Sequence, residues 1–154
     1  MKAALVKGID EPGRNPYQAF RPFNLTVPSS DSSYFCQQPP SPPVCTLIFP
    51  TVPAGKRLVV ENVTGFVAAI APGFPIPLTF SASNPGGGTI QAIPLQLLPG
   101  VEPGNIFRYG ANAALKNYIE GGHQPVILVS VSGSPGQLAH GALSVAGYLI
   151  DLGQ

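Results

Sequence analysis

The segment KRLVVENVTGFVAAI, residues 56–70, decides the fold class of this chain. Five of its apolar residues share one parity, and alternate side chains of an extended strand point to the same face. The side chains expected on the buried face are Leu58, Val60, Phe66, Ala68 and Ile70. Asn62 and Thr64 interrupt this face, and Gly65 beside them is where we expect a β-bulge to redirect the side chains. The segment therefore predicts a long, half-buried β-strand.

Proline and glycine divide the rest of the chain into short segments of similar character. The 154 residues include 19 prolines and 18 glycines, which end strands and form turns. Between them the sequence predicts strands over residues 3–7, 20–27, 33–36, 44–49, 76–82, 89–98, 105–109, 125–132 and 142–152. Short strands spaced by about 8–15 residues are typical of sandwiches and jelly rolls. We therefore predict an all-β chain: a single-domain β-sandwich, jelly-roll-like.

Three segments depart from this regular pattern. Residues 1–18 include the turn-forming stretch GIDEPGRNP, and we expect an extended N-terminal arm there, before a β-sandwich domain over residues 19–154. Residues 20–27 contain Pro22, which cannot donate to a ladder, so this strand belongs at a sheet edge. Residues 111–120, ANAALKNYIE, fit either a short helix or a strand.

The scarcity of charge is the main clue to function. Only 10% of the residues are charged and the formal net charge is +1, against roughly 25% charged residues in an ordinary domain. Because surface charge keeps monomers apart, a surface this neutral favours contact with other copies. The eight basic residues are scattered, which argues against nucleic acid. No apolar run is long enough for a membrane span, and the apolar stretch between Lys2 and Lys7 is too short for a signal peptide.

The two cysteines, Cys36 and Cys45, bracket the stretch QQPPSPPV. This separation suits a disulfide that closes a short loop, and the alternative is a pair of free thiols in a reducing compartment. A disulfide favours an extracellular, cell-surface or virion location. The spacing does not fit a zinc site, which needs four ligands and closer cysteine pairs.

No group of residues forms a recognisable catalytic set. If residues 125–132 and 142–152 paired as a hairpin, His123 and His140 would lie more than ~20 Å apart, too far to share a metal. We expect Glu61 to form an ion pair with Arg57 or Lys56 instead of serving in catalysis. The sequence therefore predicts no enzyme, no catalytic residue, no metal site and no cofactor.

One short stretch offers groups that bind sugars. Arg108, Tyr109 and Asn112 combine hydrogen-bond donors with an aromatic ring, and sugar faces stack on such rings. The alternative for Tyr109 is a half-buried core residue near the end of a strand. A carbohydrate-binding, lectin-like β-sandwich module with a glycan partner is therefore the alternative function.

The segment VPAGKRLVVENVTG, residues 52–65, together with the later strand VAGYLIDL, resembles uncharacterised bacterial β-sandwich proteins that carry a "VPAGKRLVIE"-type strand. The resemblance implies the fold and carries over no activity. The N-terminal arm and the cysteine loop are not part of it.

Low charge, strands that are apolar on both faces and the N-terminal arm together predict a structural role. We expect a non-enzymatic assembly subunit that associates with itself into a homo-oligomer or filament. An extended arm can add a strand to the sheet edge of a neighbour, where main-chain hydrogen bonds hold it.

Overall fold

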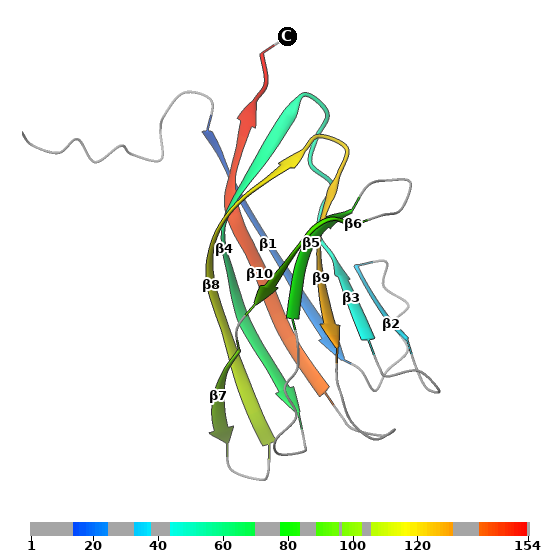
Figure 1. Ribbon diagram of the computed structural model, residues 1–154, viewed down its shortest axis with the longest axis vertical. Coiled ribbons are helices and arrows are strands. Elements are labelled where there is room, and N and C mark those ends of the chain that lie inside the picture. Colours follow the sequence, from blue (N-terminus) through cyan, green and yellow to red (C-terminus); the bar gives the residue numbers. More distant parts are fainter. Residues whose placement is uncertain are drawn as a thin grey trace, which may run out of the picture.

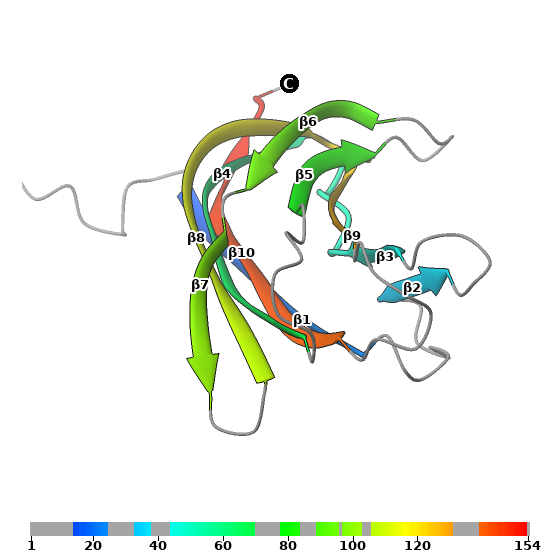
Figure 2. The ribbon, with the colours of Figure 1, turned by 60° about the horizontal axis from the view of Figure 1, so that its bottom comes forward.

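A computed structural model shows two antiparallel β-sheets that face each other (Figures 1 and 2). The structure describes residues 14–24, 33–37, 44–69, 78–83, 89–95, 97–102, 106–130 and 139–153. Within these ranges every regular element is a strand, so the predicted all-β sandwich is confirmed. The same part of the chain contains no helix long and apolar enough to cross a membrane.

The two sheets each hold five strands. Sheet A has the order β1-β10-β4-β8-β7, with β1 (Arg14–Asn24), β10 (Ala139–Asp151), β4 (Lys56–Ala69), β8 (Ile106–Glu120) and β7 (Leu97–Glu102). Sheet B has the order β2-β3-β9-β5-β6, with β2 (Tyr34–Gln37), β3 (Val44–Ile48), β9 (Gln124–Ser130), β5 (Leu78–Ser83) and β6 (Thr89–Leu95).

The chain crosses between the sheets several times, and this corrects two local expectations. β9 and β10 do not form a hairpin, because β9 pairs with β3 and β5 in sheet B, and β10 pairs with β1 and β4 in sheet A. The segment 89–98 is not one strand, since it contains β6 and the start of β7, which belong to different sheets. Both corrections concern which strands pair with each other, and local sequence patterns do not specify this pairing.

Residues 111–120 form a strand, not a helix. They are the second half of β8, where odd-numbered residues turn to the core and even-numbered residues turn to solvent. Ala111 and Ile119 are buried, whereas Asn112, Lys116 and Tyr118 are exposed. A period of two is the signature of a strand with one buried face.

The buried face of β4 differs from the predicted one because the bulge lies at Glu61 and not at Gly65. Glu61 is an extra residue relative to β10, since Val60 pairs with Gly147 and Asn62 with the preceding Ala146. An extra residue shifts the alternation by one position. The core side chains of β4 are therefore Leu58, Val60, Val63 and Val67, while Phe66 and Ala68 point the other way. Ile70 lies outside the described residues.

Gly147 allows the bulge to form. A Cβ atom at this position would collide with the carbonyl oxygen of Val59, so the two backbones approach more closely than any side chain permits. A glycine inside a strand commonly marks such a close approach.

The core fills the space between the sheets with aliphatic and aromatic side chains. Each fully buried side chain of this kind contributes roughly 1.5–3 kcal/mol relative to its exposed state. The largest of them are Phe49, Phe80, Leu47, Leu58, Ile119, Ile127 and Leu143.

β1 is an edge strand of sheet A, as Pro22 predicts. It begins at Arg14, so residues 14–18 pair with β10 in register with residues 146–150. The rest of the predicted arm, residues 1–13, lies outside the described residues, as does the predicted strand at residues 3–7.

β2 and β3 form the hairpin that the sequence predicts around the cysteines. Cys36 and Cys45 stand opposite each other in this pair, with their Cα atoms 4.1 Å apart, and are joined by a disulfide. Cys45 is completely buried in the core, so the bond ties the edge strand β2 to the interior. The predicted disulfide is confirmed.

The disulfide makes a testable contribution to stability. Replacing both cysteines, Cys36→Ala with Cys45→Ala, is expected to lower the free energy of unfolding by about 2 kcal/mol. The four prolines between them already stiffen the unfolded loop and keep the effect below that of a flexible loop. Urea denaturation measures the change. A reductant should destabilise the natural chain and leave the double variant unaffected, and equal stability of the two oxidised proteins would contradict this account.

Candidate assembly surface

The residues predicted to bind a sugar lie on both faces of β8. Arg108 and Asn112 are exposed on the outer face of sheet A, and the Arg108 guanidinium lies 4.3 Å from the centre of the Phe66 ring. Tyr109 turns to the other face and packs against the core. The structure therefore brings Arg108 close to Phe66 and places the Tyr109 ring on the opposite face of the strand.

The two histidines lie at opposite ends of sheet A. His140 pairs with Ala68 at one end of β4, whereas His123 follows the turn after β8, at the other end. Among the described residues no three His, Cys, Asp or Glu side chains are grouped so that they could hold a metal ion.

Charge is distributed unevenly between the two sheets. None of the five strands of sheet B contains a lysine, arginine, aspartate or glutamate. Every strand of sheet A contains at least one. The strands that lack charged residues therefore all lie on one side of the sandwich.

The outer face of sheet B carries one continuous row of uncharged side chains. Phe35, Thr46, Leu128 and Thr79 stand opposite one another on four neighbouring strands. They point outward because the residues next to them in the chain, such as Leu47 and Ile127, are core residues. Phe35, at the edge of this row, is 56% exposed. An exposed aromatic ring beside a neutral sheet face is typical of a contact surface.

The outer face of sheet A carries an aromatic row at one end. Val59 points outward yet is only 2% exposed, and it stands between Tyr148 of β10 and Tyr118 of β8. The guanidinium of Arg14 lies 4.5 Å from the centre of the Tyr148 ring, and that of Arg57 lies 5.9 Å from the centre of the Tyr118 ring. These cation–π contacts hold the rings over the sheet.

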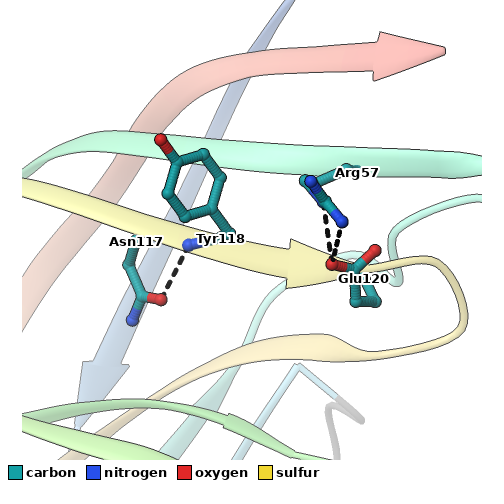
Figure 3. A network of polar contacts seen from close by, with 4 residues as sticks. All are labelled: Arg57, Asn117, Tyr118 and Glu120. Atoms are coloured by element: carbon teal, nitrogen blue, oxygen red, sulfur yellow. Dashed lines mark hydrogen bonds and ion pairs between the residues drawn. The ribbon is translucent and has the colours of Figure 1, made fainter. Parts of the chain in front are cut away.

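Arg57 also orients a carboxylate at the end of β8 (Figure 3). Its Nε and Nη2 atoms both lie 2.7 Å from Oε1 of Glu120, and both side chains are partly exposed. Lys56 pairs with Asp151 at the same end of the sheet, with Nζ 2.6 Å from Oδ1. The expected ion pair of Glu61 with Arg57 or Lys56 is therefore wrong, because cross-strand neighbours are closer to these cations than a residue on the same strand.

Asn117 is a polar residue on the core face of β8. It is 7% exposed, and its Oδ1 accepts a hydrogen bond from the Tyr118 N–H at 2.7 Å (Figure 3). Its Nδ2 has no acceptor in the described part of the chain. The Asn117 side chain therefore accepts a hydrogen bond from the backbone of the next residue, and its buried Nδ2 donor is left unsatisfied.

Sequence reasoning did not single out Tyr118, Glu120 or Phe35. The alternation over residues 111–120 places Tyr118 and Glu120 on the solvent side once the segment is treated as a strand. In the sequence alone this segment was ambiguous, because a short stretch of apolar and polar residues fits a helix as well as a strand. The exposure of Phe35 follows from its edge position, which depends on the topology.

The two sheets are joined by polar contacts where β1 meets β3. The Tyr17 hydroxyl donates to the Pro50 carbonyl at 3.2 Å, and Arg21 Nε donates to the Ile48 carbonyl at 2.8 Å. Burial raises the pKa of Tyr17 from its usual 10.0 to about 12, and the nearby Arg21 charge offsets part of this rise. The neutral, hydrogen-bonding form of Tyr17 is therefore the one that the fold favours.

No known protein family matches the sequence, and no curated protein matches it. One similar solved structure is described as "Structure of infectious bursal disease virus Gt strain"; it has 17% sequence identity and a TM-score of 0.44. The match covers 88% of this chain and 33% of that one, so this chain spans about a third of its length. Similarity at this level carries no inference about function.

The position of Tyr17 predicts a specific loss of stability at high pH. Because its pKa is higher in the folded state, the contribution of the neutral hydroxyl is complete below pH 10 and is lost as the pH rises through about 12. Absorbance of the phenolate should show a late-ionising component from Tyr17. Tyr17→Phe should remove this late component, and a titration curve that the variant leaves unchanged would count against the assignment.

Proposed function

We propose that this protein is a non-enzymatic structural subunit that associates with itself into a homo-oligomer or filament. The observation that carries the proposal is the complete lack of charged residues in the strands of sheet B, together with the exposed Phe35 ring on that sheet. Burying a neutral face removes no ionised group from water, so association there avoids the main cost of desolvation.

Open sheet edges support the same proposal. Apart from β1, which carries Pro16 and Pro22 on its outer side, the edge strands are β7 in sheet A, and β2 and β6 in sheet B. We propose that the N-terminal arm adds to such an edge on a neighbouring copy, where main-chain hydrogen bonds supply affinity. Because β1 begins at Arg14, the part of the arm that remains for this contact is residues 1–13.

The disulfide supports a location outside reducing compartments. A bond between Cys36 and Cys45 persists where the environment is oxidising, and this favours an extracellular, cell-surface or virion setting for the proposed subunit.

A charge placed on sheet B should weaken association. Phe35→Lys introduces a cation at an exposed position, so the fold should tolerate it while the neutral face becomes costly to bury. Phe20→Lys on β1 is the matched control, because Phe20 is 59% exposed and lies on the charged sheet. Native mass measurement at micromolar concentration should show the natural chain and the Phe20 variant as oligomers and the Phe35 variant as smaller species. A natural chain that is monomeric under these conditions would refute the proposed function.

Deletion of the arm should weaken assembly without unfolding the sandwich. Removal of residues 1–13 leaves all of β1 and its pairing with β10 in place. We expect a thermal unfolding midpoint close to that of the full chain and a smaller oligomer in the same mass measurement. Full assembly by the shortened chain would show that the arm is not the contact.

A further inference from the structure

We propose that two copies of this chain meet side by side along β8, antiparallel and centred on Tyr118, so that Lys116 of each copy pairs with Glu120 of the other. The inference rests on the proposed self-association and names one surface that would mediate it. It is independent of the arm and of sheet B.

The relevant edge of β8 has no strand beside it in the described part of the chain. β4 pairs with β8 from Phe107 to Glu120 on one side, whereas β7 pairs only with Ile106 to Ala111 on the other. Residues 112–120 therefore present an open edge that faces away from β4. Such an edge is a template for another strand.

The hydrogen-bond pattern shows which backbone groups point to this edge. Leu152 N–H donates to the Gly55 carbonyl at 2.9 Å, and bonds of an antiparallel ladder recur at every second residue pair. The backbone groups of Val59 therefore face β10, and those of Tyr118, which lies opposite Val59 on β8, face the open edge. The same alternation directs the N–H of Glu120 to the open edge.

The opposite edge of sheet A is closed to such pairing. By the same alternation, the even-numbered residues of β1 direct their backbone groups away from β10, and these include Pro16 and Pro22. Proline has no N–H to donate, and proline on an edge strand blocks addition of another strand. Residues 106–120 contain no proline, so β8 lacks this form of protection.

Charge selects the register and the partner. Lys116, Tyr118 and Glu120 project from the same outer face, and in an antiparallel pair of identical strands a two-fold axis at Tyr118 places each lysine opposite the glutamate of the other copy. An axis at Lys116 would place lysine against lysine. An axis at Ala114 would require residues 108–110, where β7 is already bound.

Both charged groups have capacity for a new partner. Arg57 bonds only Oε1 of Glu120, and the second carboxylate oxygen has no marked contact in Figure 3. Lys116 is exposed and has no ion-pair partner within the described ranges. Four residues apart on one strand, at ~13 Å, Lys116 and Glu120 cannot pair within a single copy.

The aromatic row of sheet A would continue across this contact. Tyr148, Val59 and Tyr118 already stand in line, and the Tyr118 ring of a second copy would extend the line from the other side. The N–H of Tyr118 is held by Asn117 Oδ1, so the contact at the axis is made by the tyrosine rings and not by a ladder bond. Edge-on or offset packing of such rings favours association.

Charge-reversed copies provide the test. Lys116→Glu gives a copy with glutamate at both positions, and Glu120→Lys gives a copy with lysine at both positions. Each variant alone should dimerise at least about tenfold more weakly than the natural chain, because both pairs become repulsive. An equimolar mixture should recover dimers, since both pairs are then complementary, and a merely structural defect would not be rescued by mixing. Glu61→Lys, on an exposed residue of β4, is the control and should have no effect.

A cross-link tests the axis directly. Tyr118→Cys places a thiol opposite its own copy and should give a covalent dimer on mild oxidation, detected by mass without reductant. Ala114→Cys, at an exposed position on the same face, should remain largely monomeric. If the natural chain assembles but neither reversal weakens it and Tyr118→Cys does not cross-link, this contact is refuted while the proposed function stands. A natural chain that stays monomeric refutes both.

Discussion

β4 is paired along almost its whole length on both sides, with β10 and with β8, and the geometry of sheet A depends on this double pairing. The bulge at Glu61 shifts the alternation of β4 so that valines from both halves of the strand reach one core. Gly147 permits the close approach that the bulge needs. Without that shift, one half of the strand would turn its apolar side chains to solvent.

Segregation of charge gives the sandwich two different sides. Sheet A carries the cation–π contacts and the ion pairs that hold its outer face, such as that between Arg57 and Glu120. Sheet B has no charged residue in its strands and relies on the core and on the disulfide. The two sides of the sandwich therefore differ in the charge that their strands carry.

Much of the fold followed from local patterns. The alternation in residues 56–70 predicted β4, Pro22 predicted the edge position of β1, and the spacing of Cys36 and Cys45 predicted the hairpin and the disulfide. The arrangement of the candidate sugar-binding residues did not follow from local patterns. Arg108 and Asn112 were placed with Tyr109 because they are close in sequence, but adjacent residues of a strand point to opposite faces.

The sequence by itself determined the fold class, the strand segments and the scarcity of charge, because alternation, proline positions and composition are local properties of the chain. Only the tertiary structure decided that β9 and β10 lie in different sheets, that the bulge is at Glu61 and that Glu120 is the partner of Arg57. These features depend on which strands become neighbours. Strand pairing depends on packing between residues that are far apart in the chain, and a local sequence pattern does not contain this information.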